Sequence, residues 1–307
     1  MNRGARHPER LGRYRSYDPP PAGFDPHTAP DAVLLRHGLP RRPDPEREPQ
    51  LARIWKRVFA RPLTYLKAEL KVEKAMSDRN PLRDKDPVFG PVGWAGAIVR
   101  QGQPFTWVFA EWVIPQVTGH KHFWEADIPI GFWVGIDGFT MNNDQVLQAG
   151  IAAVLSTSWR WFLPHSVIGY WVWAEWWPKG AVTVSNFPVE PGQTVSFVVC
   201  APQPGDFASV FIANASTGYG TSVGIDAPEG TTSEGDSAEW IVEKPDNAKV
   251  LLQFSPVTFN DCWAGKPNHI VDLGSAFETN IVGASGNLTD AKIMQPNSVV
   301  VTWKASD

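Results

Sequence analysis

The sequence predicts an all-β fold, an antiparallel β-sandwich of two sheets, preceded by an N-terminal segment that is extended and partly helical. From residue 88 onward, about a dozen runs of 5 to 9 residues are rich in Val, Ile, Leu, Phe, Trp and Thr and are separated by Gly, Pro, Asn and Asp turn signals. No helical periodicity is found after residue 90. Many short strands without intervening helices are typical of an antiparallel sandwich or barrel.

The chain changes character near residue 86, which predicts two parts, 1–85 and 86–307. Residues 1–85 hold 19 Lys and Arg against 11 Asp and Glu, a net charge of +8, whereas the remainder has a net charge of −12. Proline is concentrated in the first part, and of the 15 tryptophans only Trp55 lies there. We therefore expect a basic, Pro-rich segment next to an acidic β domain of about 220 residues.

The basic segment contains one predicted helix. Residues 1–49, with Pro19–Pro21 and the 41–45 stretch, are predicted to be extended and poorly ordered in isolation. From Gln50, apolar residues recur at helical spacing and predict an amphipathic helix that ends near Pro62: Leu51, Ile54, Trp55, Val58 and Phe59. We expect this helix to dock on the acidic domain; a solvated arm and a contact with nucleic acid or a membrane are the alternatives.

Representative strands of the acidic part are Thr106–Ile114, Thr194–Val199 and Val250–Phe254. One tripeptide, Ala-Glu-Trp, occurs three times, with its glutamate at Glu111, Glu175 and Glu239. In a strand each glutamate points away from its Ala and Trp neighbours. A glutamate on a water-facing strand is an ordinary surface residue, whereas one on a Trp-lined concave sheet has a raised pKa and can serve as an acid or base. The pattern by itself does not choose among the three.

Several classes of protein and site are not expected. No apolar run reaches the roughly 18 residues needed to span a bilayer. The Arg- and Pro-rich start lacks the apolar segment of a signal peptide, so a cytoplasmic or non-classically exported protein is expected. Cys200 and Cys262 are too few for a disulfide scaffold, and His120 and His122 lack a third metal ligand nearby. We expect no metal, no cofactor, no nucleic acid and no membrane partner.

The order of five motifs resembles the glutamic peptidases, the eqolisins, over roughly residues 90–265. The motifs are Gly93–Ala97 (GWAGA), Trp133–Gly138 (WVGIDG), Leu147–Gly150 (LQAG), Trp173–Pro178 (WAEWWP) and Ala238–Glu243 (AEWIVE). The resemblance implies a concanavalin-like jelly roll of two curved antiparallel sheets and an acid endopeptidase that acts on polypeptides. It also implies a catalytic pair, Gln148 and Glu239, and substrate-groove residues: Trp133, Asp137, Trp173, Glu175 and Trp177.

The implied chemistry agrees with the two residue types. A glutamate can take a proton from water and return it to the leaving amine. A glutamine does not titrate, but its amide NH₂ can donate a hydrogen bond to the oxyanion and its carbonyl can orient the water. Three positions depart from the usual pattern of the family: Gly93 stands where Asn is usual, Ala152 where fungal members carry Asp, and Trp177 where Tyr is usual. We expect these to alter substrate contacts more than the catalytic pair.

Two other functions remain open from the sequence. A Trp-rich β-sandwich can bind carbohydrate, or hydrolyse it with Glu175 and Glu239 as paired carboxylates. An inactive structural relative is the other. For a peptidase, we expect a monomer whose residues 1–85 are an inhibitory prosegment, held by charge and by the helix, and released in acid with cleavage around residues 84–91.

Overall fold

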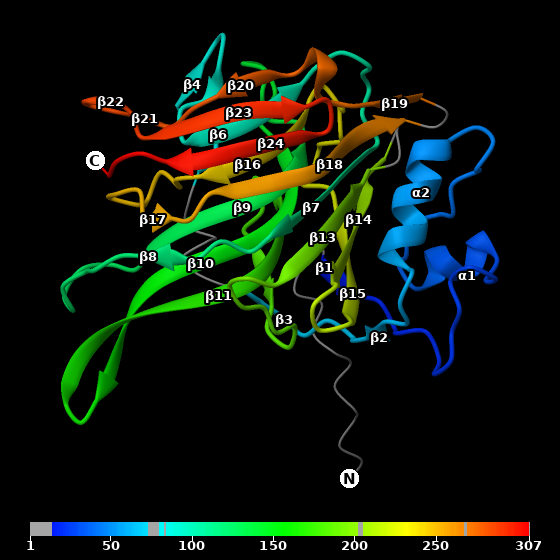
Figure 1. The fold of residues 1–307 in the computed structure, drawn as a ribbon, viewed down its shortest axis with the longest axis horizontal. Helices are drawn as coiled ribbons and strands as arrows, with labels where there is room; N and C mark the ends of the chain where they lie inside the picture. Colours follow the sequence, from blue (N-terminus) through cyan, green and yellow to red (C-terminus); the bar gives the residue numbers. More distant parts are fainter. Residues whose placement is uncertain (1–13, 73–79, 83, 202–204, 267–268, 307) are drawn as a thin grey trace.

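Two antiparallel sheets face each other in the computed structural model, which describes residues 14–72, 80–82, 84–201, 205–266 and 269–306 (Figure 1). The predicted two-sheet β class is confirmed. Residues 1–13 of the predicted extended segment lie outside the described residues.

Sheet A is ten-stranded within the described residues. Its main path runs β1 (Tyr14–Ser16), β15 (Tyr219–Asp226), β14 (Phe207–Asn214), β13 (Thr194–Cys200), β7 (Trp107–Val113), β18 (Val257–Lys266), β24 (Ser298–Trp303) and β23 (Thr289–Gln295). Two short strands join it off this path: β2 (Thr64–Tyr65) pairs with β15, and β19 (His269–Val271) pairs with β18.

Sheet B is eight-stranded within the same residues. Its order is β20 (Phe277–Thr279), β6 (Trp94–Val99), β16 (Ala238–Glu243), β9 (Ile128–Ile136), β10 (Val146–Arg160), β11 (Leu163–Trp177), β12 (Val182–Val184) and β3 (Leu70–Val72). Three small ladders complete the β structure: β8 (Val117–Thr118) with β17 (Gln253–Phe254), β21 (Val282–Gly283) with β22 (Gly286–Asn287), and β4 (Lys85–Asp86) with β5 (Gly90–Pro91). A 3₁₀ turn covers Leu273–Ser275.

The main core fills the space between the two sheets, because alternate residues of each strand point inward. Trp112 of sheet A and Trp240 of sheet B are both fully buried there. The indole Nε1 of Trp240 donates to the backbone oxygen of Phe109, 2.9 Å away, and so links the sheets. The predicted strand 250–254 is wrong over most of its length, because only Gln253–Phe254 is a strand. Leu251 and Leu252 are instead buried in an irregular segment, so apolar content there reflects burial rather than strand pairing.

The predicted amphipathic helix is confirmed as α2 (Pro49–Val58). Proline at its first turn is favourable, since the amide hydrogen that proline lacks would have no helical acceptor. The sequence did not predict α1 (Asp31–Arg36), nor that β1 and β2 extend sheet A and β3 extends sheet B. The N-terminal segment thus contributes edge strands to both sheets.

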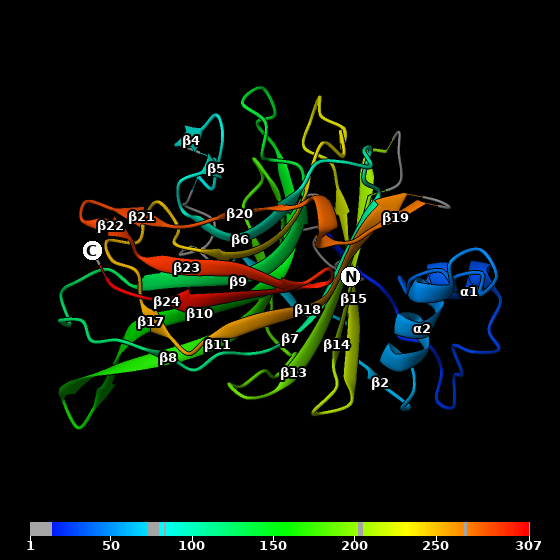
Figure 2. The same ribbon diagram turned by 45° about the horizontal axis from the view of Figure 1, so that its top comes forward.

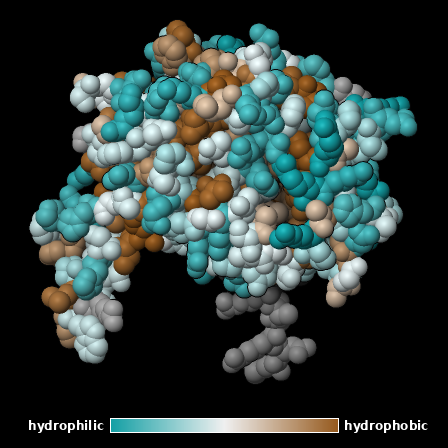
Figure 3. Space-filling model, in the orientation of Figure 1, coloured by the Kyte–Doolittle hydropathy of each residue, from teal (hydrophilic) through white to brown (hydrophobic). Residues whose placement is uncertain are grey.

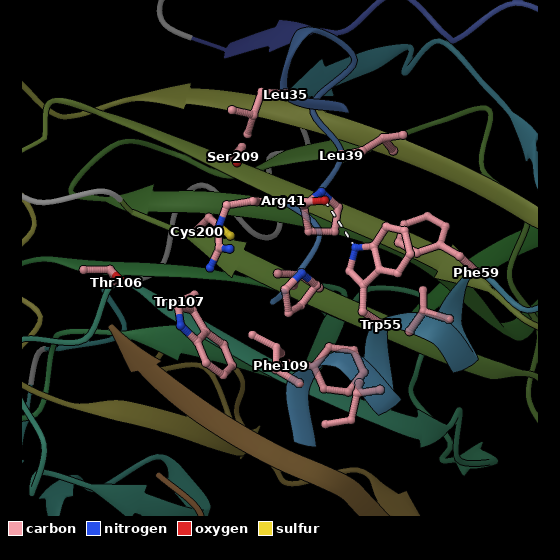
Figure 4. Close-up of a pocket in the computed structure, with 16 residues that line it drawn as sticks. Leu35, Leu39, Arg41, Trp55, Phe59, Thr106, Trp107, Phe109, Cys200 and Ser209 are labelled. Atoms are coloured by element: carbon pink, nitrogen blue, oxygen red, sulfur yellow. Dashed lines mark hydrogen bonds between the residues drawn. The ribbon is translucent and has the colours of Figure 1, made fainter. Parts of the chain in front are cut away.

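Helices α1 and α2 cover the outer face of sheet A (Figures 1 and 2). Phe59 stacks on Phe211 of β14 with ring centroids 5.3 Å apart, and Trp55 packs against Phe59. The packing leaves an apolar cavity of about 350 Å³ between this layer and β7, β13 and β14 (Figure 4). Cys200 and Ser209 line it from the sheet, and Trp55 lines it from the helix.

Candidate active site

The outer face of sheet B, turned away from sheet A, carries the site residues. Trp240 and Trp176 point into the main core, so the alternation of the strands places Glu239 and Glu175 on the opposite face. A second cluster of buried apolar side chains covers this outer face: Leu82, Trp94, Ile98, Trp133, Phe139, Val146, Ala152, Trp173, Ala181 and Ile241.

The strand register places Gln148 and Glu239 in one cross-strand row. Gln148 of β10 is paired with Gly135 of β9 on one side and with Glu175 of β11 on the other. Glu239 of β16 is paired with the same Gly135. The backbones of Gln148 and Glu239 are therefore two strand spacings, about 10 Å, apart. Only a glycine lies between them in this row, and the ring of Trp133 from the same strand reaches over that position.

Glycine at position 135 is required by close packing. A Cβ added there would lie 3.0 Å from the backbone oxygen of Leu147, 2.8 Å from the ring of Trp133 and 3.3 Å from Cβ of Gln148. The Leu147 oxygen belongs to the sheet backbone and has little freedom to move. The sheet therefore requires glycine at this position between Gln148 and Glu239.

Gln148 is oriented by a carboxylate. Its side chain is fully buried, and Nε2 donates a hydrogen bond to Oε2 of Glu175, which is 2.7 Å away. An amide NH₂ has two hydrogens, so this bond leaves one of them available to another acceptor. Oε1 of Gln148 has no hydrogen-bond partner among the described residues.

Glu239 is a buried carboxyl group with an altered pKa. It is fully buried, and neither carboxyl oxygen has a hydrogen-bond partner in the described part of the chain. Burial raises the pKa of Glu239 well above its ordinary value, the Ser237 hydroxyl opposes this shift, and the nearby carboxyl groups of Asp236 and Asp137 raise the pKa further. Buried polar atoms without partners are rare in folded proteins and call for an explanation. Here they lie in the cross-strand row with Gly135 and Gln148.

The predicted tryptophans share this face. Trp133 and Trp173 are fully buried, and Trp177 is partly buried against the same cluster. Trp133 meets Trp94 edge to face, with centroids 4.8 Å apart. The indole Nε1 of Trp133 donates to Oε2 of Glu243, 2.9 Å away. Glu243 is a site residue that the sequence reasoning did not select, although it lies four residues after Glu239 on the same strand and therefore on the same face.

Asp137 lies at the end of β9 and holds a loop. Its carboxylate accepts hydrogen bonds from the Ser233 hydroxyl, the Glu234 amide and the Asp236 amide, at 3.1, 3.0 and 2.9 Å. Burial raises the pKa of Asp137 to about 6, although these three bonds favour the ionised form. Its oxygens face the loop that leads into β16, so the structure places Asp137 beside the row of Gln148 and Glu239 as a support for the strand that carries Glu239.

The described residues contain no group of three His, Cys, Asp or Glu side chains placed to hold a metal ion. His120 and His122 lie outside the strands, with ring centroids 6.1 Å apart, and His122 stacks on Trp124.

Cys200 and Cys262 are free cysteines. The 350 Å³ cavity lies on the outer face of sheet A, away from Gln148 and Glu239.

Comparison with known proteins gives one family and a set of similar folds. The model of the Peptidase A4 family matches residues 92–303. Scytalido-glutamic peptidase, solved with a transition state analog inhibitor, is similar with a TM-score of 0.56 and 23% identity, over 69% of this chain and 98% of that one. SCP-B, described as a member of the Eqolisin family and solved with the tripeptide Ala-Ile-His, gives a TM-score of 0.53 and 22% identity over the same shares. These likenesses show a shared fold. Curated protein sequences give no match.

Proposed function

The chain belongs to the Peptidase A4 family, the eqolisins, and is a glutamic endopeptidase; from this premise we propose that Glu239 and Gln148 form its catalytic pair. The observation that carries the proposal is the cross-strand row, in which Gln148 and Glu239 stand on either side of Gly135 on the same face of sheet B. Their backbones are two strand spacings, about 10 Å, apart.

Each proposed role uses a group that the structure describes. Ionised Glu239 takes a proton from the water that attacks the peptide carbonyl and then returns it to the leaving amine. Gln148 donates its second amide hydrogen to the oxyanion, while its first stays on Glu175. The unpartnered Oε1 of Gln148 orients the water. Trp133, Trp173 and Trp177 line the groove, and Glu175 and Asp137 position the catalytic groups.

The same geometry argues against a glycosidase built on Glu175 and Glu239. Their strands are separated by β10 and β9, which gives three strand spacings, about 14 Å, between the backbones. Paired carboxyl groups of glycosidases lie about 5 to 9.5 Å apart. In addition, one oxygen of Glu175 accepts the hydrogen bond from Gln148, which lies between the two glutamates.

The test compares Glu239→Gln, Gln148→Ala and the double variant on a denatured protein substrate from pH 2 to 8, with products identified by mass. Loss of one oxyanion donor costs about 3 to 4 kcal/mol of barrier, and loss of a general acid–base group costs about 10²- to 10⁴-fold in rate. Each single variant should therefore lose at least about a hundredfold in kcat. Groups that act as one unit are not additive, so the double variant should be little worse than either. Glu111→Gln, which changes the glutamate of another Ala-Glu-Trp copy, is the matched control. Full activity in folded Gln148→Ala would refute the pair.

We propose further that the N-terminal segment inhibits the enzyme by covering this face. β3 adds an edge strand to sheet B beside β12, and Leu82 packs in the cluster on the outer face. The Lys85 ammonium donates to the backbone oxygen of Thr140, 2.8 Å away. Gln148 and Glu239 are both fully buried in this arrangement. We expect a polypeptide to reach them only after the segment around Leu82 moves.

The contacts that hold this segment are mostly backbone pairing and apolar packing. Two ion pairs, Arg15 with Asp226 and Arg57 with Asp261, connect the segment to the rest of the described chain. Both are at least partly exposed, and exposed pairs contribute little. Loss of these two ion pairs would therefore weaken the docking without abolishing it, and cleavage of the chain is needed for full release.

The hairpin of β4 and β5 is the expected cleavage region, because Val88 and Phe89 at its tip are 62% and 55% exposed. A recognition sequence for a specific protease, placed between Asp86 and Gly90, allows the full chain to be cut there after folding. We expect peptidase activity to rise after the cut and after separation of the fragment in acid, and the Glu239→Gln chain to stay inactive under the same treatment. A cut and separated enzyme that stays folded yet is no more active than the intact chain would exclude the inhibitory role.

A further inference from the structure

The hairpin of β10 and β11 extends far beyond sheet B. Both strands have 15 residues, and their pairing continues to Arg160 and Leu163. The neighbouring strand β9 pairs with β10 only as far as Leu155, and β12 pairs with β11 only at Val172–Ala174. Residues 156–171 therefore form a two-stranded arm, which projects from the body of the molecule in both ribbon views (Figures 1 and 2).

The turn at the end of this arm has unusual residues. Trp161 and Phe162 adopt φ values of 52° and 63°. Two successive positive φ values are typical of the hairpin turn that Asn-Gly or Gly-Gly forms with least strain. Trp161 is nevertheless 83% exposed and Phe162 is 95% exposed. Neither folding nor solubility accounts for two bulky aromatic residues at this turn.

Further exposed apolar residues join these two in what we call the aromatic tip: Phe123, Trp124, Trp159, Trp161, Phe162 and Leu163. Phe123 comes from the loop that follows β8, and its ring lies 5.8 Å from that of Trp159 and 4.8 Å from that of Trp124. This loop is fixed to the arm, since the Lys121 ammonium donates to the Thr157 hydroxyl, 2.8 Å away. In the space-filling view the arm stands out at the lower left with apolar residues on it (Figure 3).

The charge of the arm differs from that of the domain around it. No Asp or Glu occurs between Asp144 and Glu175, whereas Arg160 and His165 lie in this stretch. The remainder of the chain from residue 86 carries a net charge of −12. The arm is thus a carboxylate-free projection of an acidic domain. The loop beside it carries Glu125 and Asp127, and the Lys121 ammonium lies 3.6 Å from Asp127, so we expect little repulsion from a neutral or anionic surface.

The shape of the aromatic tip limits the kind of partner that it can bind. A stable contact with a protein, including a second copy of this chain, uses about 20 to 30 residues on each side. The aromatic tip offers six side chains on a narrow arm. A lipid bilayer has no such minimum, and Trp and Phe are favoured where acyl chains meet head groups.

We propose that the aromatic tip attaches the enzyme peripherally to the surface of a lipid bilayer. In the described residues no helix is long and apolar enough to cross a membrane. The sequence-based expectation of no membrane partner rested on the lack of a spanning segment, and a peripheral contact needs none. The arm is continuous with the strands that carry Gln148 and Glu175, so attachment would fix the direction of the catalytic face relative to the membrane.

The test is flotation of the full chain with vesicles of phosphatidylcholine, alone and with 30% phosphatidylglycerol. The main variant is Trp161→Asn with Phe162→Gly, which installs the preferred turn residues and removes the two most exposed aromatic rings. We expect its vesicle affinity to fall by at least about tenfold, equivalent to about 1.4 kcal/mol, with unchanged activity on a soluble peptide. The control variant is Met294→Ser, which changes an exposed apolar residue of β23. This variant should bind vesicles as the unchanged chain does.

Quenching of tryptophan fluorescence by brominated phosphatidylcholine gives a second readout on the unchanged chain. Strong quenching that disappears in the folded variant Trp124→Ser or in the double variant supports insertion of the tip. No flotation with either vesicle, or equal flotation of the double variant and the unchanged chain, would overturn the proposal. So would a dimer of the unchanged chain, seen by sedimentation velocity, that the double variant abolishes without any vesicle binding.

Discussion

Glu175 holds the amide of Gln148 in one orientation, because only the NH₂ end of that amide can donate to a carboxylate. In Glu175→Gln, position 175 can also present an NH₂ group, and the Gln148 amide can then turn over. We expect kcat to fall by about 10- to 100-fold, the usual cost of about 1 to 3 kcal/mol for a misplaced buried hydrogen bond, with KM changed much less.

Glu111→Gln is the control for this prediction, because Glu111 is the glutamate of an Ala-Glu-Trp copy in sheet A, where its carboxylate accepts from the Ser196 hydroxyl. The prediction is tested by measuring kcat and KM of both variants on one soluble peptide. Equal activity of Glu175→Gln and the unchanged enzyme would show that Gln148 does not depend on Glu175.

The glycine between Gln148 and Glu239, the proposed catalytic pair, gives a second prediction. In Gly135→Ala, the new methyl group meets the Leu147 carbonyl oxygen at 3.0 Å and stands between Gln148 and Glu239. We expect kcat/KM to fall by at least about tenfold, an effect of about 1.4 kcal/mol. Gly131→Ala is the matched control, since Gly131 lies on the same strand and face, and its added Cβ meets only the side chains of Trp133 and Glu243, at 3.2 Å or more. A similar loss in both variants would point to general strain in β9.

At the level of elements, the contact between α2 and sheet A is imperfectly packed, since it leaves a partly open apolar pocket of about 350 Å³. In Ser209→Leu, the larger side chain projects from β14 into this cavity and contacts the helical layer. We expect a gain of about 1 kcal/mol in stability, seen as a rise of about 2 to 4 °C in Tm. If the N-terminal segment is inhibitory, the Ser209→Leu enzyme should also gain activity more slowly after the chain is cut, because the helical layer is held more tightly on sheet A. Ser209→Ala, which removes the hydroxyl without filling the cavity, should show neither effect, and an unchanged Tm in Ser209→Leu would contradict the prediction.

For the molecule as a whole, buried carboxyl groups make part of its stability depend on pH. Burial raises the pKa of Asp137 from 3.8 to about 6. A carboxyl group with a raised pKa in the folded state binds its proton more tightly there. Its stabilising contribution is therefore complete below about pH 4 and is lost as the pH rises through about 6. The amount is about 3 kcal/mol. Burial of Glu239 acts in the same direction.

We therefore expect Asp137→Asn to reduce the difference in unfolding free energy between pH 4 and pH 7, measured by urea titration at each pH. The control is Asp290→Asn, a carboxylate on β23 that is 39% exposed and paired with Lys292. The same pH dependence in Asp137→Asn and in the unchanged chain would contradict this prediction.

The fold class followed from local pattern. Short β-rich runs predicted the strands, helical spacing predicted α2, and the alternation of side chains along a strand correctly put Trp112, Trp176 and Trp240 on the face opposite their glutamate neighbours. These features depend on residues near each other in the chain, so the sequence alone determines them. The order of the motifs also determined the family.

The tertiary structure decided which residues lie next to each other on neighbouring strands. The three Ala-Glu-Trp copies are locally identical, but Glu111 lies in sheet A while Glu175 and Glu239 share a row with Gln148 in sheet B. The addition of β1 and β3 to the edges of the two sheets was likewise invisible in the sequence. Strand pairing joins residues that are tens to hundreds of positions apart, and a local pattern fixes which way a side chain points but not which strand lies beside it.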